Sequence, residues 1–333
     1  MESPPSAARS DGLLRFACVA ALLAATGTAL AQSGDAEGHR GRVAISYQYN
    51  EARNLIATDF FIPTTTLTTQ AADFAVDFAI NSRWTVSGGL PLIRRKDEDP
   101  THLHDPLRIA PPQRDSPYLD DGRWHSSWQD LRFGASYLVP TDPVNGISVE
   151  PYVQISIPAS HYPFFGNAAV GQHLRHTEIG ATLGYHPPFL RWDFDLRAGY
   201  AYGPSTLGIG IDATRIDGEA VRFVSPRLSW KVFFSSKHGD GIPVLATLPD
   251  LSSALWYYHD RITRHNYINM GVGVDWRLNR GNVLELDWIQ MVHAQDAFQL
   301  RKAFNFTLSH PFGRATPQAP GTQRKTQPST FSD

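Results

Sequence analysis

The sequence predicts an all-β fold, a transmembrane antiparallel up-and-down β-barrel of about 12 strands. Several segments alternate apolar and polar side chains, and a period of two is what a β-strand presents on its two faces. These segments span about 11 to 13 residues, which exceeds the usual length of soluble strands and matches that of a tilted strand crossing a bilayer. The region after the N-terminal segment contains no apolar run of about 18 residues, which excludes helical spans there.

The alternation is clearest near the C-terminus. Residues 266–278 carry apolar side chains at every second position, with glycine and polar residues between them. An Asn-Arg-Gly-Asn turn follows, residues 284–293 repeat the pattern, and residues 294–299 are predicted to form a polar bend. The final strand, residues 304–312, ends on Phe312. Because the polar faces carry carboxylates and glycine, a wet lumen is favoured over a dry core.

The remaining strands are predicted from the same alternation, and strand 213–223 is needed to keep the strand count even. Short connections fall near residues 81, 140, 186, 225 and 280. Since outer-membrane barrels have short periplasmic turns and long external loops, residues 50–66, 94–127, 158–171 and 236–263 are predicted to be external. The other predicted strands are residues 43–49, 73–80, 84–90, 128–139, 147–157, 174–185, 190–202, 213–223 and a strand beginning at Leu228.

The N-terminus has the pattern of an export signal. Basic residues precede an apolar segment, and Ala29-Leu30-Ala31 is an A-x-A cleavage site. Cys18, the only cysteine, lies within this segment, so the mature chain would have no thiol. The predicted organisation is a signal peptide at residues 1–31, a periplasmic segment at 32–41, the barrel at 42–312 and a disordered tail at 313–333, in the cell outer membrane.

The inward faces of the predicted strands supply the candidate pore residues. Acidic side chains outnumber basic ones there, so an open lumen would attract cations and favour neutral or cationic solutes. Alternatively, opposite charges pair across strands as a structural network that partly fills the lumen. The predicted lumen-lining residues are Asp73, Asp77, Asp130, Arg132, Glu150, Tyr152, Glu178, Asp195, Arg197, Lys231, Asp275, Arg277, Glu285 and Asp287.

The sequence gives little indication of metal binding or catalysis. His259, Asp260, Arg261 and Arg264 are external-loop candidates, but no histidine spacing forces the three or four converging ligands of a zinc site, so no metal is predicted. The sequence has no G-x-S-x-G motif and no His and Ser pair two residues apart on one inward face of a predicted strand. No catalytic residues are therefore predicted, and the protein is not expected to be an enzyme. Net charge is -2 and the pI is about 6.7, which implies no nucleic-acid partner. No cofactor is expected.

Several short motifs resemble one family. The segments 128–137, 150–158 and 178–180, together with Pro226-Arg227-Leu228-Ser229 and His259-Asp260-Arg261, are similar to outer-membrane barrels associated with transport in the meta-pathway of phenol degradation. The resemblance covers about residues 65–312. It implies passage of hydrophobic or aromatic small molecules across the outer membrane. Two features depart from the family: 21 residues follow Phe312, and residues 94–127 are strongly charged.

These patterns lead to one hypothesis and two alternatives. The first is an outer-membrane channel for passive uptake or export of small solutes, hydrophobic or aromatic ones among them. Its expected partners are outer-membrane lipid, a small-molecule solute and the outer-membrane assembly machinery. The second is a non-conducting barrel with a structural or surface-interaction role, its lumen plugged by the charged network or by residues 94–127. The third is a soluble periplasmic β-sandwich.

Overall fold

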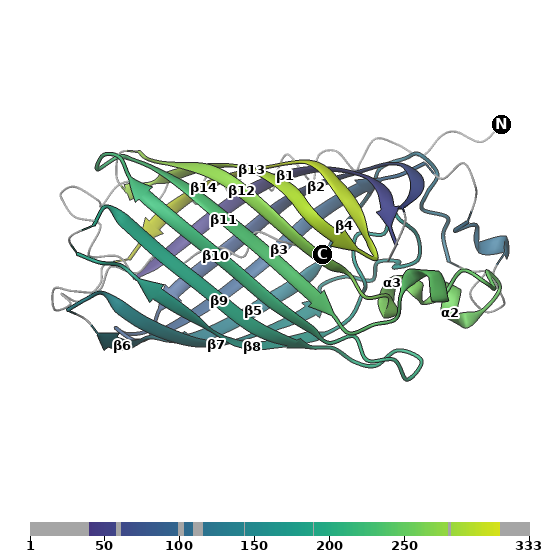
Figure 1. The fold of residues 1–333 in the computed structure, drawn as a ribbon, viewed down its shortest axis with the longest axis horizontal. Coiled ribbons are helices and arrows are strands. Elements are labelled where there is room, and N and C mark those ends of the chain that lie inside the picture. Colours follow the sequence, from purple (N-terminus) through teal and green to yellow (C-terminus); the bar gives the residue numbers. More distant parts are fainter. Residues whose placement is uncertain are drawn as a thin grey trace, which may run out of the picture.

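The chain forms one closed antiparallel β-barrel of twelve strand passes (Figure 1). The structure, a computed structural model, describes residues 40–57, 61–98, 103–108, 116–142, 144–188, 190–278 and 281–313. The predicted signal peptide and C-terminal tail lie outside these residues, except for Gly313. Among the helices of the described part, none is long and apolar enough to cross a membrane.

Neighbouring strands follow the order of the sequence around the barrel, and β1 closes it by pairing with β14. The chain pass from His125 to Asp142 contains β4, β5 and β6, which Gln129 and Leu138 interrupt. The strands are β1 (Gly41–Ile56), β2 (Phe61–Ala79), β3 (Trp84–Lys96), β4 (His125–Trp128), β5 (Asp130–Tyr137), β6 (Val139–Asp142), β7 (Ile147–Pro158), β8 (His176–Tyr185), β9 (Trp192–Tyr202), β10 (Ala213–Phe223), β11 (Leu228–Gly239), β12 (Asn266–Arg277), β13 (Val283–Gln295) and β14 (Ala297–Phe312).

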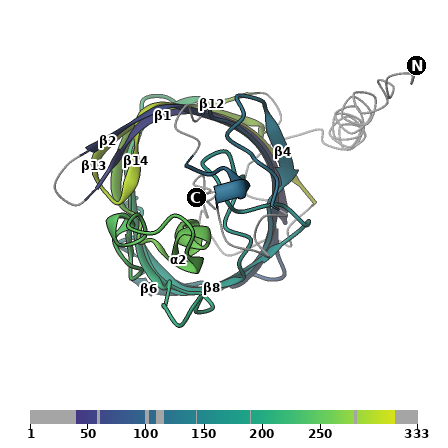
Figure 2. The same cartoon turned by 90° about the vertical axis from the view of Figure 1, so that its right-hand side faces the viewer.

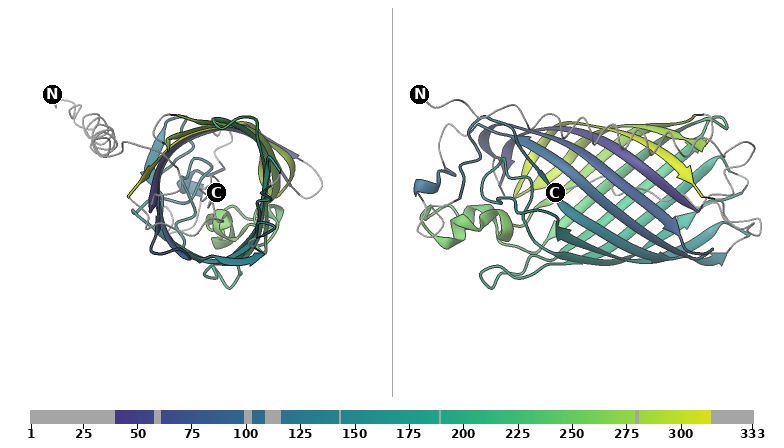
Figure 3. Two further views of the ribbon diagram at one scale, coloured as in Figure 1. Left: turned by 90° about the vertical axis from the view of Figure 1, so that its left-hand side faces the viewer. Right: turned by 180° about the vertical axis from the view of Figure 1, so that it is seen from behind.

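Closure confirms the predicted fold class and the predicted location in the outer membrane. Gly41 pairs with Phe312, and the ladder between β1 and β14 continues to Ile56 opposite Ala297. A closed ladder leaves no sheet edge, which is the condition for a β-structure in hydrocarbon. The view along the axis shows one ring of strands and not two stacked sheets (Figure 3), so the soluble sandwich alternative is wrong.

The outer surface is apolar because every second residue faces away from the axis. In β14, Phe304, Phe306 and Leu308 are 50%, 44% and 42% exposed. The residues between them, Asn305 and Thr307, are 3% and 2% exposed. Large apolar side chains at such exposure would be a liability in water, whereas lipid accommodates them. The predicted division of each strand into an apolar outer face and a polar inner face is therefore confirmed here.

Several predicted boundaries are wrong. Residues 50–66 were expected to form a loop, but β1 and β2 extend through most of them, with 16 and 19 residues respectively. The bend predicted at residues 294–299 is confined to Asp296, whose φ of 54° lets β13 turn directly into β14. β11 likewise runs to Gly239, past the predicted start of an external loop at residue 236. These strand ends extend beyond the apolar belt and carry polar residues. The alternation of apolar and polar side chains that predicts a strand is therefore absent there.

Long connections gather at one end and form a cap over the barrel mouth. Figure 1 places α2 (Ala254–Tyr257) and α3 (His259–Ile262) at this end, beyond the strands, and Figure 2, which looks onto this end, shows α2 in front of the opening of the ring. The loop of residues 159–175 folds inward, since its Tyr162 and Val170 pack with Ala71 and Ile93 of the inner wall. This overturns the prediction of a purely external loop at 158–171. The described parts of residues 94–127 pack onto that loop through Asp120 and Asp97.

Reversing the polarity of the outer face should impair membrane insertion. Val76 of β2 is exposed on the lipid side, so Val76→Arg should cost roughly 2–4 kcal/mol in folding stability, as a cation at mid-bilayer does. The readout is heat-modifiable gel mobility after folding into lipid vesicles. Ala75→Ser, on the neighbouring inner position, is the control and should fold normally. Equal loss in both variants would refute the assigned faces of β2.

Candidate pore

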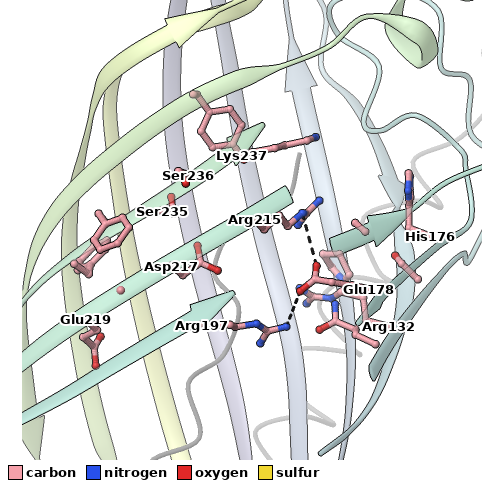
Figure 4. A pocket seen from close by; sticks show the side chains of 18 of the residues that line it. Arg132, His176, Glu178, Arg197, Arg215, Asp217, Glu219, Ser235, Ser236 and Lys237 are labelled. Carbon is pink, nitrogen blue, oxygen red and sulfur yellow. Dashed lines mark hydrogen bonds and ion pairs between the residues drawn. The ribbon is translucent and has the colours of Figure 1, made fainter. Parts of the chain in front are cut away.

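A polar cavity occupies the lumen beneath the cap (Figure 4). Its water-accessible volume is about 170 Å³, well above the roughly 10–15 Å³ that one water needs by this measure. Side chains therefore do not fill this part of the barrel. Among the predicted lumen-lining residues, those that line this cavity are Asp130, Arg132, Glu178, Arg197, Lys231, Glu285 and Asp287.

Lys231 is the centre of one charge cluster. Its ammonium lies 3.5 Å from Glu219 and 3.0 Å from Asp287, and it also contacts Glu285. These residues come from β10, β11 and β13, which the barrel brings side by side around the glycine of β12 at position 273. Lys231 is 5% exposed. Three carboxylates around one buried ammonium hold the strands in register, and the cluster remains formally anionic.

Glu178 of β8 is the centre of a second cluster. Its Oε1 accepts hydrogen bonds from Arg197 at 3.0 Å and from the Tyr152 hydroxyl at 2.6 Å. Its Oε2 lies 3.7 Å from Arg215 of β10. The Arg197 guanidinium also lies 3.8 Å from the centre of the Tyr152 ring, a cation-π distance. Figure 4 shows Glu178 between the two arginines at the cavity wall. One carboxylate thus compensates two guanidinium groups.

The other predicted lumen residues occupy smaller networks. Asp73 binds Arg132 at 2.6 Å, Asp77 lies 3.4 Å from Arg42, and Asp195 lies 3.5 Å from His186. Asp275 accepts a hydrogen bond from Ser229, and Asp130 accepts one from the Tyr162 hydroxyl of the inward loop. Glu150 is half-buried in β7, while Arg277 is exposed at the end of β12. Arg277 thus stands apart from the charge clusters described above.

Glycines make room for the large lumen side chains. A Cβ added at Gly199 would lie 2.3 Å from the Tyr152 hydroxyl, and one at Gly180 would lie 2.6 Å from it. Phe233 occupies the corresponding space over Gly271. These side chains therefore lie flat against the wall instead of projecting into the axis. The inward glycines keep the cavity open.

The sequence reasoning missed several inward bases. Arg42, Arg215 and Lys237 are not among the predicted lumen-lining residues, and nothing in the alternation distinguishes Arg42 and Lys237 from surface residues. Arg215 and Lys237 line the cavity, and Arg42 approaches Asp77. The predicted acidic surplus is consequently smaller than the sequence suggested. Arg215 could have been found, because it occupies an inward position of the predicted strand 213–223, two residues before Asp217.

Three of the four external candidates lie in α3 of the cap, and two of them join it to the inward loop. Asp260 Oδ2 accepts a hydrogen bond from the Gly166 amide at 3.2 Å. Arg261 donates to the Gln172 carbonyl at 2.8 Å and the His173 carbonyl at 3.3 Å. His259 is buried against Trp256, and this burial lowers its pKa. These contacts hold the inward loop in the mouth.

Arg264 lies apart from that group and stabilises the turn between β13 and β14. Its Nε is 2.8 Å from Asp296 Oδ2, and Asp296 is fully buried. Within the described ranges, no group of three or more His, Cys, Asp or Glu residues is arranged to hold a metal ion. The cap is therefore best described as a packed aromatic and hydrogen-bonded unit.

A closed barrel with an apolar belt and a polar lumen defines an outer-membrane β-barrel. No protein-family model and no curated protein matches the sequence. In fold, the chain is similar to an outer membrane channel from Pseudomonas putida F1, at 13% identity and a TM-score of 0.60, covering 85% of this chain and 100% of that one. The NanC porin gives 8% identity and a TM-score of 0.47, with coverage of 81% and 98%. The first similarity supports the fold.

Removing the central ammonium should destabilise the barrel. Lys231→Met leaves three clustered carboxylates without their cation, and breaking a buried ion pair costs about 3–5 kcal/mol. Urea unfolding in lipid vesicles measures this loss. Lys302→Met is the matched control, because Lys302 is 60% exposed and its pair with Glu51, at 3.4 Å, should contribute less than about 1 kcal/mol. Similar losses in the two variants would argue against a structural role for the Lys231 cluster.

Proposed function

We propose that this protein is an outer-membrane channel for the passive uptake or export of small solutes. The observation that carries this proposal is the water-accessible cavity inside a closed barrel, lined by residues from nine strands that include β5, β8, β10 and β13. Fixed charges of both signs stabilise polar solutes in such a lumen. The glycines behind Tyr152 and Phe233 support the same proposal, since they preserve space that larger residues would fill.

The class of solute is proposed more broadly than the family resemblance alone implies. That resemblance supports hydrophobic or aromatic molecules, and Phe233 and Tyr267 offer aromatic surface within the cavity. Most of the lining is charged or amide-bearing, which favours solutes that also carry polar groups. Because Lys231 and the two arginines beside Glu178 neutralise much of the acidic charge, we propose at most a modest preference for cations.

The cap narrows the proposed pathway of the solute, but its packing does not favour a barrel with a sealed lumen. The inward loop packs on β2 and β3, along one side of the mouth, through Val170 and the residues around it. The polar cavity remains beneath it. A non-conducting barrel with a plugged lumen is therefore the less favoured alternative. We propose that the cap sets the size limit for solutes.

Assembly is proposed to use the last strand. β14 ends on the aromatic Phe312, whose ring stacks at 6.4 Å on Phe78 across the closure of the barrel. A terminal aromatic strand is the feature expected to engage the outer-membrane assembly machinery. The predicted tail beyond residue 313 lies outside the described residues.

Conductance in planar bilayers tests the channel directly. The reconstituted mature protein should produce discrete current steps in potassium chloride, because the lumen is water-accessible. Heat-modifiable gel mobility confirms that the same preparation is folded. A folded protein that stays electrically silent would contradict the proposed function and favour the plugged barrel.

Loosening the cap should raise the conductance. Arg261→Ala removes two hydrogen bonds to the inward loop and the guanidinium that lies 3.5 Å from the centre of the Phe164 ring. The expected result is a larger or noisier single-channel current. Arg123→Ala is the matched control, since Arg123 is 85% exposed, and it should conduct as the unmodified protein does. Unchanged current in Arg261→Ala would show that the inward loop does not limit flow.

A further inference from the structure

Four exposed arginines gather along one stretch of the barrel rim, at the end opposite the cap (Figure 1). This arginine patch consists of Arg191 just before β9, Arg222 near the end of β10, Arg227 just before β11, and Arg277 at the end of β12. Backbone hydrogen bonds join its members, since the Phe223 amide donates to the Arg191 carbonyl at 2.8 Å and the Arg277 amide donates to the Arg227 carbonyl at 2.7 Å. Neighbouring strands lie about 4.8 Å apart, so the patch covers roughly 15 Å of the rim.

The positive charge of the arginine patch is not compensated by the protein. Within the described ranges, none of its four guanidinium groups forms an ion pair. Two acids close to it in sequence lie on the inner face of the wall instead. Asp193 lies 3.5 Å from His186, and Asp275 is buried and accepts a hydrogen bond from Ser229. Four like charges along one short stretch favour an anionic ligand.

The position of Arg222 indicates where that anion comes from. Arg222 lies on the outer face of β10, directly opposite Trp192 of β9 and Trp230 of β11. Its guanidinium carbon is 5.7 Å from the centre of the Trp192 ring, and the two indole rings are 5.5 Å apart. Tryptophans on the lipid-facing surface lie at the depth of the lipid headgroups, and an arginine there extends its charged end among them. A soluble partner would meet the turns, whereas Arg222 faces the lipid.

We propose that the arginine patch binds the headgroup phosphates of anionic phospholipids in the inner leaflet of the outer membrane. The patch lies at the end with the short turns, which is the periplasmic end of such barrels. A guanidinium binds a phosphate through paired N–H donors and stays charged at any physiological pH. Zwitterionic lipids carry their own cation beside the phosphate, so they compensate the patch less well. The inference goes beyond the proposed channel and does not depend on whether the barrel conducts.

Native mass spectrometry of the folded mature protein in detergent micelles tests this inference. The protein is titrated with dioleoyl phosphatidylglycerol and separately with dioleoyl phosphatidylcholine, which has the same acyl chains and no net charge. The anionic lipid should be retained at concentrations at least tenfold lower. The double variant Arg222→Gln/Arg227→Gln should weaken its retention at least tenfold, because each basic residue at an anionic membrane surface contributes about fivefold in affinity. Heat-modifiable gel mobility confirms that each variant is folded.

Arg83→Gln is the matched control at the same end of the barrel. Arg83 lies in the turn between β2 and β3, across the ring from the turn between β10 and β11. Its guanidinium donates to the Tyr137 hydroxyl at 2.9 Å, so it already has a protein partner. Its replacement should leave the retention of phosphatidylglycerol unchanged.

Four results would overturn the inference. They are equal retention of the two lipids, unchanged retention of phosphatidylglycerol in the double variant, an equal loss in Arg83→Gln, or displacement of phosphatidylglycerol by an equal concentration of sodium phosphate. The last result would identify a site for free phosphate and not for lipid. Should the double variant fail to fold, Arg191→Gln/Arg277→Gln removes the other two charges of the arginine patch and carries the same expectation.

Discussion

The whole architecture depends on pairing every backbone donor and acceptor within a surface that touches lipid. Hydrocarbon offers no hydrogen bonds, so the sheet must close, and the β1–β14 ladder from Gly41 to Ile56 provides the closure. Alternation of side chains then has an unavoidable consequence. The face turned to lipid is apolar, as Phe304 and Phe306 show, and the opposite face encloses a lumen where charge can be concentrated.

Charge inside the lumen is largely organised into cross-strand clusters. Lys231 joins β10, β11 and β13, and Glu178 joins β8, β9 and β10. Such clusters stabilise the register of the strands. They also offset the free-energy cost of placing ions in a low-dielectric surrounding, because each charge lies beside an opposite one. They also line the cavity, so the groups that hold the wall together are the ones a passing solute meets. Structure and proposed selectivity therefore depend on the same side chains.

The fold was predictable from local pattern, whereas the clusters were not. Alternation predicted strand 147–157, which differs by one residue from β7 (Ile147–Pro158), because a strand's two faces are encoded in neighbouring residues. The meeting of Lys231 with Glu285 depends on register between strands far apart in the chain, which no local pattern records. The tight turn at Asp296 and the inward folding of the loop around Val170 depend on tertiary contacts for the same reason.

The central claim is that adjacent residues of one strand face lipid and water in turn. Ile155 and Ser156 of β7 provide the sharpest pair, since Ile155 is an exposed outer residue and Ser156 lines the cavity. Each is replaced by cysteine in a chain that carries Cys18→Ser, and the protein in lipid vesicles is treated with a charged, membrane-impermeant thiol reagent. The account predicts labelling of Ser156→Cys and protection of Ile155→Cys. Equal labelling, or the reverse order, would contradict it.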